Sequence, residues 1–340
     1  MSAPGRIGEG VLNRRSFLIL ALASAGALAT GCASGEGSAG SAGSAAAGAQ
    51  GAGAQEAVAF VDDLGYEVEV SDPQRVVACM GSFANAWELA GGALAGATDD
   101  AWENYDIYSA DAASVGRSTA LNLEAILACN PDFAIMTAKS SSKHETGVSQ
   151  DELKAALDAA GVPVAFFSVT GFDDYLRMLG VFCDITGRDD LYALNGTDVQ
   201  ARIEEIVEEY SVADRAPSAL VFSASSKGVS AQDSDTMCGL MLADLGAVNL
   251  IDENPGLLSD FSMEAVLEID PDYLFVLAAG SDEAAAQENY EQSVESDPAW
   301  SQLTAVQQGR STVLDTQHFL QKPNADWDES YLILAEALAK

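Results

Sequence analysis

Basic residues are scarce in this sequence. Its 340 residues include 16 Lys and Arg against 52 Asp and Glu, so the formal net charge is −36 at pH 7. Nucleic-acid phosphates and anionic lipid headgroups attract clusters of basic side chains, and the sequence offers no such cluster. We therefore expect no nucleic-acid partner. Hydrophobic residues make up 48% of the chain, which is too many for an acidic disordered protein, and the length allows about two domains.

Histidine and the common catalytic motifs are also missing. His144 and His318 are the only histidines, whereas a protein site for Zn²⁺ or Mn²⁺ usually draws on several. No GxSxG, HExxH or GxxxxGK[ST] sequence occurs. The sequence thus predicts no enzyme activity, no cofactor and no directly bound metal.

Cysteines are few, and none shows the CxxC spacing of a metal or redox site. Cys79, Cys183 and Cys238 fall in apolar stretches, so we expect them to be buried. An exported protein can oxidise its cysteines, and the sequence does not say whether these three or Cys129 pair.

No uncharged apolar run approaches the length of a membrane-spanning helix. The run from Phe17 to Ala29 follows Arg14-Arg15 and has the length of a signal-peptide core. Residues 13–18 resemble a twin-arginine export signal, although ordinary secretory signals also carry paired arginines, so both export routes stay open.

Residues 28–32, LATGC, resemble a bacterial lipobox, in which the cysteine is lipidated and becomes the new N-terminus. We therefore expect a signal peptide over residues 1–31, lipidation of Cys32, and a Gly/Ala/Ser linker over residues 32–57. Several acyl chains on one residue anchor a protein firmly. The resemblance implies an exported protein, held on the outer face of the bacterial cytoplasmic membrane by its lipid anchor only.

From residue 58 onward, hydrophobic periodicity predicts strands that alternate with helices, which is typical of α/β folds with parallel sheets. A short hairpin is expected over residues 58–70. We expect further strands at residues 75–80, 132–137, 162–167, 219–222 and 312–314. We expect helices at residues 85–90, 123–129, 150–160, 173–185, 237–245 and 326–338.

Two segments of the sequence resemble each other. Residues 121–138 read LNLEAILACNPDFAIMTA and residues 261–278 read FSMEAVLEIDPDYLFVLA, with six identities at a fixed offset of 140 residues. Each copy has a residue suited to cap a helix, then an acid in the first helical turn, a short apolar helix, a Pro-Asp break and a buried strand. Two such copies indicate two lobes of related design.

Between the copies, residues 189–210 are predicted to form one long helix with an apolar stripe and a glutamate-rich face. The sequence therefore predicts an α/β protein of two Rossmann-like lobes, residues 58–188 and 215–340, joined by a connecting segment at residues 189–214. Ligands of open parallel sheets bind beyond the carboxyl ends of the strands. We expect the ligand cleft between the lobes, where two such edges would face each other.

The chain from about Gly65 onward resembles the solute-binding lipoproteins of ABC importers for iron–siderophore complexes, haem and cobalamin. The order and spacing of several short pieces carry the resemblance: Asp72-Pro-Gln-Arg75-Val-Val, Val115-Gly116-Arg117, Asn122-Leu-Glu124, Asn130-Pro131-Asp132, Ile185-Thr-Gly187-Arg188, Leu245-Gly246-Ala247-Val248-Asn249, Ser262-Met-Glu264, Asp270-Pro-Asp272 and Lys322-Pro-Asn.

This resemblance implies a monomer that delivers its ligand to an ABC permease dimer with ATPase subunits. In that family an acid on each lobe pairs with permease arginines, and the matching positions are the repeated Glu124 and Glu264. The simpler reading is that both acids only favour a helix N-terminus. With so few histidines, any metal would arrive inside a chelate, namely a ferric siderophore, haem or cobalamin.

Ligand-contact candidates are the aromatic and cationic residues that follow strands. Trp102, Tyr105 and Tyr108 suit stacking on a flat ligand, and Arg117 suits pairing with an anionic chelate. The other candidates are placed by topology: Ser82, Phe83, Lys139, Lys227, His318 and Phe319. For the three aromatic residues, packing within their own loop is the competing interpretation. An exposed loop histidine is the favoured interpretation of His318, and core packing is favoured for Trp327.

Two other functions stay open at this point. One is a receptor that presents its ligand to a sensor without transport. The other is a cofactor enzyme built on the same duplicated α/β body.

Overall fold

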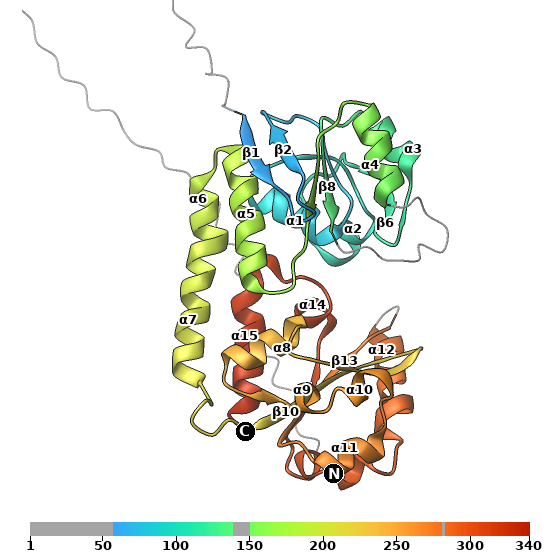
Figure 1. Ribbon diagram of the computed structural model, residues 1–340, viewed down its shortest axis with the longest axis vertical. Helices are drawn as coiled ribbons and strands as arrows, with labels where there is room; N and C mark the ends of the chain where they lie inside the picture. The colour runs from blue at the N-terminus through green and yellow to red at the C-terminus, as the bar shows by residue number, and fades with distance from the viewer. Residues whose placement is uncertain (1–56, 139–149, 281–282) are drawn as a thin grey trace, which may run out of the picture. The chain divides into compact units, whose positions relative to one another are not determined.

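The computed structural model describes residues 57–138, 150–280 and 283–340 (Figure 1). The predicted signal peptide, Cys32, nearly all of the linker, Lys139 and His144 lie outside the described residues, so what the sequence predicts for them stays a prediction. Within the described part of the chain, no helix is long and apolar enough to cross a membrane.

The first lobe is built on a parallel sheet. A hairpin of β1 (Val58–Val61) and β2 (Glu67–Val70) precedes it, as predicted. The five strands of the sheet lie in the order β5-β4-β3-β8-β9 and all pair in parallel. Their bounds are β3 (Val76–Ala78), β4 (Leu94–Ala97), β5 (Ala113–Ser114), β8 (Phe133–Thr137) and β9 (Val164–Phe167). The strands are short apolar runs because both faces of such a sheet are covered.

The helices of this lobe are α1 (Gly81–Leu89), α2 (Asp100–Asn104), α3 (Leu123–Ala128), α4 (Gln150–Ala159) and α5 (Phe172–Thr186), with a small ribbon of β6 (Gly116–Arg117) and β7 (Ala120–Leu121) before α3. Two expectations were wrong here. Helix α1 begins at Gly81 and not at residue 85, because the chain turns into the helix directly after β3. The segment after β4, for which no helix was predicted, begins with α2.

The predicted helix over residues 189–210 is present, as α6 (Asp189–Tyr192), a π-helical segment η2 (Ala193–Thr197) and α7 (Asp198–Tyr210). Tyr192 and Thr197 have right-handed helical backbone angles, so the three parts are continuous. Gly196 lies where a Cβ would approach Leu176 of α5 to 2.8 Å. The glycine therefore lets the connecting helix pack closely on α5.

The second lobe has a sheet in the order β11-β10-β13-β14, with β12 on the side of β10. Its strands are β10 (Ser218–Ser225), β11 (Gly228–Gln232), β12 (Val248–Asn249), β13 (Tyr273–Ala278) and β14 (Ser311–Leu314). All pairings are parallel except that of β10 with β11, an antiparallel edge that the sequence analysis did not anticipate.

The second lobe also contains many short helices: α8 (Met237–Asp244), α9 (Leu250–Glu253), α10 (Gly256–Ser259), α11 (Met263–Ile269), α12 (Glu283–Tyr290), η3 (Glu291–Glu295), η4 (Trp300–Gln302), α13 (Thr304–Gln307), α14 (Thr316–Phe319) and η5 (Asn324–Asp326). The last helix, α15 (Trp327–Leu338), packs along α7. Figure 1 shows the two running side by side, with α5 above α15.

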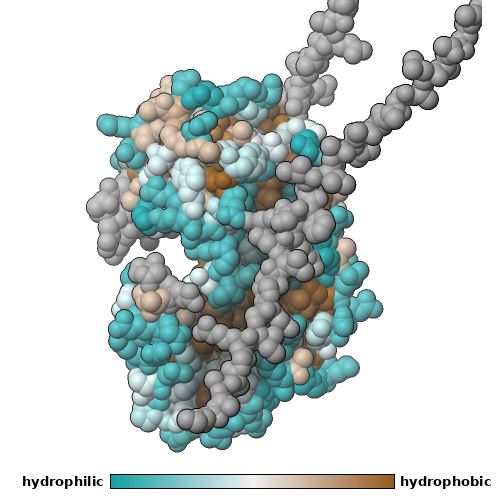
Figure 2. Space-filling view, turned by 180° about the vertical axis from the view of Figure 1, so that it is seen from behind, coloured by the Kyte–Doolittle hydropathy of each residue, from teal (hydrophilic) through white to brown (hydrophobic). Residues whose placement is uncertain are grey.

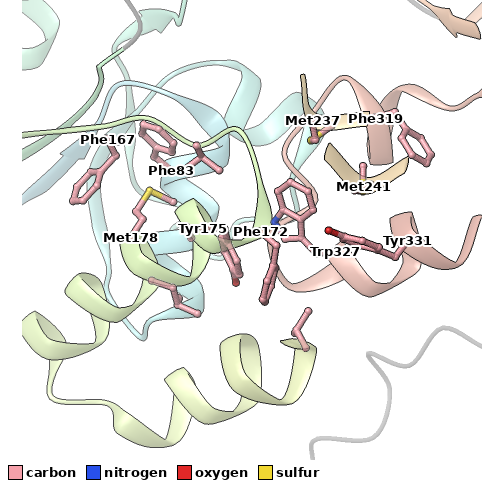
Figure 3. Close-up of a cluster of buried hydrophobic side chains, with 14 of the residues drawn as sticks. Phe83, Phe167, Phe172, Tyr175, Met178, Met237, Met241, Phe319, Trp327 and Tyr331 are labelled. Atoms are coloured by element: carbon pink, nitrogen blue, oxygen red, sulfur yellow. The ribbon is translucent and has the colours of Figure 1, made fainter. Parts of the chain in front are cut away.

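One hydrophobic core joins the two lobes. It contains Phe83 and Phe167 from the first lobe and Met241 and Tyr331 from the second, and Trp327 packs against Phe172 across the junction with ring centroids 6.2 Å apart (Figure 3). The predicted core role of Trp327 is therefore confirmed. Because interiors pack densely, a continuous core resists large relative movement of the lobes.

The four described cysteines, Cys79, Cys129, Cys183 and Cys238, are buried with free thiols. Burial raises the pKa of Cys79 and of Cys183 to about 12, and that of Cys238 higher still. These thiols therefore stay protonated at neutral pH, as structural cysteines do. The predicted burial of Cys79, Cys183 and Cys238 is confirmed.

The repeated segment adopts the same conformation in both lobes. Asn122 and Ser262 cap α3 and α11, each accepting a hydrogen bond from the backbone N–H three residues later. The helices lead to Asn130 and Asp270, with φ of 48° and 38°, and then to β8 and β13, which are interior strands of their sheets. Asn and Asp tolerate this left-handed conformation better than most residues. The duplication seen in the sequence is thus a duplication of structure.

Candidate functional site

The carboxyl ends of the strands in the two sheets are brought together by the segment after β14. Gln317 on α14 donates from Nε2 to the carbonyl of Asn104 on α2, at 3.1 Å. Farther along, the Tyr105 hydroxyl donates to the Lys322 carbonyl at 3.2 Å and accepts from the Lys322 N–H at 3.1 Å. These contacts join the end of β14 to the end of β4.

Asn324 completes this junction. It is 1% exposed, and its Nδ2 donates to the Ser82 carbonyl at 2.9 Å and to Asn85 Oδ1 at 2.8 Å. Both acceptors lie in α1, directly after β3. Figure 2 shows the surface hollowed between the two lobes, at the left of the view. Gln317, Lys322 and Asn324 therefore tie the second lobe to α1, α2 and Tyr105 at the carboxyl edge of the first sheet, where the ligand cleft is predicted.

An exposed indole and an exposed guanidinium lie on adjacent elements of the first lobe. Trp102 on α2 is 38% exposed, and Arg117 on β6 forms an ion pair with Glu103 of α2, with 2.9 Å between Nη2 and Oε1. The two elements are also tied by the Asp99 N–H, which donates to the Gly116 carbonyl at 2.9 Å. Because α2 follows β4 and β6 follows β5, both side chains start from the carboxyl edge of the sheet.

The two tyrosines predicted beside Trp102 lie in different places. Tyr105 is 9% exposed, burial raises the pKa of its hydroxyl, and its hydrogen bonds join the lobes. Tyr108 is exposed, but its hydroxyl donates to the carbonyl of Gly92, just before β4. Tyr108 therefore lies near the amino end of β4, and the structure does not bring it together with Trp102.

Ser82 and Phe83 are buried in the first turn of α1. Phe83 packs edge-on against Phe167 with centroids 6.4 Å apart. Neither side chain presents a surface to a ligand in this conformation, because the chain after β3 enters a buried helix and not a loop.

In the second lobe, Lys227 lies in the exposed turn between β10 and β11, beyond the carboxyl end of β10. Phe319 is 3% exposed and belongs to the shared core. His318 lies on α14, and its Nδ1 is 2.8 Å from Asp315 Oδ1 while its Nε2 is 3.6 Å from Glu329 Oε2.

The hydrogen bond that the protonated ring donates to Asp315, aided by the Glu329 carboxylate, raises the pKa of His318. This histidine therefore has a structural role at the start of α14, whatever its relation to a ligand. Within the described residues, no group of three or more His, Cys, Asp or Glu side chains is arranged to hold a metal ion.

Glu124 and Glu264 are both exposed in the first turns of their helices. Glu264 accepts a hydrogen bond from the Ser262 hydroxyl at 3.1 Å. In the described part of the chain, the Glu124 carboxylate has no protein hydrogen-bond partner. The two acids thus share exposure and position but not a local bonding role.

Sequence reasoning missed the residues that join the lobes, chiefly Gln317 and Asn324. The Lys322-Pro-Asn piece had been matched as part of the family pattern, but a short polar motif does not reveal a contact with α1 more than 200 positions away. Glu103, the partner of Arg117, is one acid among 52 and carried no distinguishing signal.

Comparison with known proteins gives a family and a fold. The family model described as "Periplasmic binding protein" matches residues 76–317. No curated protein matches the chain.

Solved structures match along most of their length. The catecholate-siderophore binding protein VctP from Vibrio cholerae is 16% identical, with a TM-score of 0.64 and coverage of 83% of this chain and 100% of that one. IsdE of Staphylococcus aureus, solved with heme, is 15% identical, with a TM-score of 0.63 over 78% and 99%. SirA of the same species, solved with staphyloferrin B, is 19% identical, with a TM-score of 0.60 over 83% and 97%.

Proposed function

Because the chain belongs to the periplasmic binding protein family, we propose that it is the substrate-binding protein of an ABC importer and captures an iron chelate or a corrinoid. Members of this family bind solutes, so the chain is a binding protein and not an enzyme. The ligand proposal extends to this chain the ligands of the similar solved proteins: a catecholate siderophore for VctP, heme for IsdE and staphyloferrin B for SirA.

The observation that supports the ligand proposal is the exposure of Trp102 on α2 and of Arg117 on β6, two adjacent elements that follow strands of the first sheet. An exposed indole stacks on a flat macrocycle or catecholate ring. A guanidinium pairs with carboxylate or catecholate oxygens. On binding, an anionic ligand would replace Glu103 as the partner of the Arg117 guanidinium. We propose that Lys227, in the second lobe, also pairs with the anionic ligand. Lys139 is proposed for the same role because it follows β8 in the sequence.

The buried candidates have a supporting role in this proposal. Ser82, Phe83 and Phe319 are buried, so they would support the elements that carry the contact residues and would not touch the ligand, and Tyr105 would fix the distance between the lobes. With a shared core and a continuous connecting helix, the two lobes would move by only a few degrees when ligand binds. The cleft is then largely preformed, which lowers the ordering cost of binding.

Delivery to the permease is assigned to Glu124 and Glu264. Both carboxylates are exposed, one on each lobe, at equivalent positions of a duplicated structure. Such a pair suits a permease made of two equivalent halves. The protein would act from the outer face of the cytoplasmic membrane, anchored through lipids on Cys32.

Fluorescence titration of the purified protein with haem, cobalamin and a panel of ferric siderophores tests the ligand proposal. One ligand class is expected to quench tryptophan emission with saturating 1:1 binding. Trp102→Ala and Arg117→Ala are each expected to weaken that binding about tenfold or more, since each removes a direct contact. Arg188→Ala is the matched control, because Arg188 forms a similar exposed pair with Asp190 at 2.7 Å, away from the strand ends.

No response to any of these ligands would overturn the ligand proposal. A receptor that presents ligand to a sensor would bind in the same titration. Stimulation of the ATPase of a reconstituted permease by the loaded protein separates the two roles, and no stimulation would favour the sensor.

A further inference from the structure

A cavity of about 620 Å³ lies beside the connecting helix, apart from the cleft residues described above. Its walls come from the start of α5, one face of α7, helix α8 and Tyr331 of α15. Figure 3 shows Phe172, Met241 and Tyr331, which line this cavity, in the region where the helices of the two lobes meet. The volume lies within the usual range of small-molecule sites, about 300–1,000 Å³.

The inner wall is apolar. Phe172, Ile203 and Met241 are buried beneath the cavity, and Val207 and Leu240 are half-buried at its sides. These side chains offer methylene, methyl and ring surface and no hydrogen bonds. A ligand that fits here must therefore carry an apolar segment.

The charged side chains that line this wall are all negative, and the neighbouring cation Arg177 lies outside the lining, 3.9 Å from Asp174. The lining includes five carboxylates and, among its described residues, no Lys, Arg or His: Asp173, Asp174, Glu204, Glu208 and Asp244. Glu204 and Glu208 lie one turn apart on α7, so they face the cavity together. An anion would be repelled from this site, and a neutral apolar molecule would leave the carboxylates unused.

The acids differ in how they are engaged within the protein. Asp174 accepts from the N–H groups of Thr170 and Gly171, and Asp244 accepts from the Tyr331 hydroxyl at 2.5 Å. Asp173, Glu204 and Glu208 are exposed at the rim. Three rim carboxylates spread over two helices suit several positive charges along one molecule better than a single metal ion, which needs converging oxygen ligands.

We propose that this cavity binds a linear polyamine, with its methylene segments on the apolar wall and its ammonium groups paired with the rim carboxylates. The walls belong to α5 of the first lobe, α8 and α15 of the second and the connecting helix. A polyamine bound here therefore contacts both lobes without entering the cleft, and it stabilises the arrangement in which they are held.

Calorimetric titration of the full chain with spermine in about 150 mM NaCl tests this proposal, because that salt screens diffuse attraction to a highly acidic protein. The expected result is 1:1 binding together with a rise in the thermal unfolding temperature, as for any ligand specific to the folded state. Glu204→Gln combined with Glu208→Gln is expected to weaken binding about tenfold or more through loss of two ion pairs.

The matched control is Glu205→Gln combined with Glu209→Gln. These two exposed acids lie on the same helix, carry the same charge and do not line the cavity. An effect below about twofold is expected, because exposed charges outside the site contribute little. Equal weakening by both double variants, or binding of many spermines per chain, would show attraction to the net charge and overturn the proposal.

A steric variant tests the apolar half of the site without changing charge. Val207→Trp places a ring inside the cavity from the half-buried wall of α7. It is expected to abolish spermine binding while the circular dichroism spectrum stays as in the wild type. Undiminished spermine binding by this variant would show that the polyamine binds elsewhere on the surface and would refute the proposal.

Discussion

The repeated segments, residues 121–138 in the first lobe and 261–278 in the second, share a backbone but differ in the contacts of their side chains. In both, an aspartate two residues after the left-handed position binds the strand that precedes the repeat. Asp132 accepts from the N–H groups of Gln74 and Arg75 before β3, each at 2.8 Å. Asp272 accepts from the N–H and the hydroxyl of Ser218 at the start of β10.

The left-handed positions themselves are used differently. The carbonyl of Asn130 accepts from the Arg75 guanidinium at 3.1 Å. Asp270 instead uses its carboxylate, which accepts from the N–H and hydroxyl of Thr304 at the start of α13. The same backbone turn is thus tied to a preceding strand in one lobe and to a following helix in the other.

This difference shows which identities between the copies have a structural cause. The shared Pro-Asp pair ends the helix and fixes the strand, so both lobes need it. The shared Glu has no common bonding role, because only Glu264 contacts its capping residue. Retention of an exposed acid at both positions therefore supports a role outside the protein, which is the docking that we propose.

The largest effect is expected from reversing both acids. Glu124→Arg combined with Glu264→Arg should abolish ligand uptake by cells, because both proposed permease contacts become repulsive. Ligand affinity of the purified protein should not change. Each single reversal should leave intermediate uptake, and Glu268→Arg, an exposed acid later on α11, should leave uptake as in the wild type. Normal uptake by the double variant would refute the docking role.

A smaller effect is expected when the two aspartates are removed one at a time. Asp132→Ala and Asp272→Ala should each lower the free energy of unfolding by about 1–2 kcal/mol, because each carboxylate accepts two hydrogen bonds at an exposed site. Urea unfolding measures this, and the Asn variants, which keep an acceptor, should lose less. A loss of stability in only one of the two variants would mean that Asp132 and Asp272 do not have equivalent roles in their lobes.

Much of the fold around the two repeated segments could be predicted from the sequence. The caps at Asn122 and Ser262, the Pro-Asp break and the long helix with its acidic face are local patterns, and each local pattern determined a local structure. The alternation of strands and helices was enough to give the α/β class. The short helix α2 and the antiparallel strand β11 were missed, because neither has a strong hydrophobic period.

The candidate site was less predictable, for a physical reason. Whether an aromatic residue after a strand lines a cleft depends on what packs over it from elsewhere in the chain. Trp102 stays partly exposed, whereas Phe83, in the first turn of a buried helix, joins the core. Tyr105 is covered by the backbone of Lys322, 217 positions away, and no local pattern reveals such a contact.

Exchange of the two helix caps should have a milder effect than loss of the aspartates. Asn122→Ala and Ser262→Ala should each cost about 1 kcal/mol of stability, since each removes the acceptor for a first-turn N–H. The exchanges Asn122→Ser and Ser262→Asn should be nearly neutral, as both residue types cap well. Thermal or urea unfolding checks this, and a large loss on exchange would mean that the caps are specific to their lobes.

The smallest expected effect is on the pH dependence of stability, through Asp272 in the second repeated segment. The Ser218 N–H and hydroxyl hold the pKa of Asp272 below its usual range. A carboxyl with a lowered folded pKa adds stability above its unfolded pKa of about 3.9, and this contribution disappears as the pH falls through the folded pKa. Asp272→Asn keeps an acceptor but cannot titrate, so its stability should fall less steeply than the wild type's below about pH 5. Urea unfolding at several pH values measures how steeply the free energy of unfolding falls in each protein. Parallel curves for the wild type and Asp272→Asn would show that the charge of Asp272, as distinct from its hydrogen bonds, adds nothing to the stability of the second lobe.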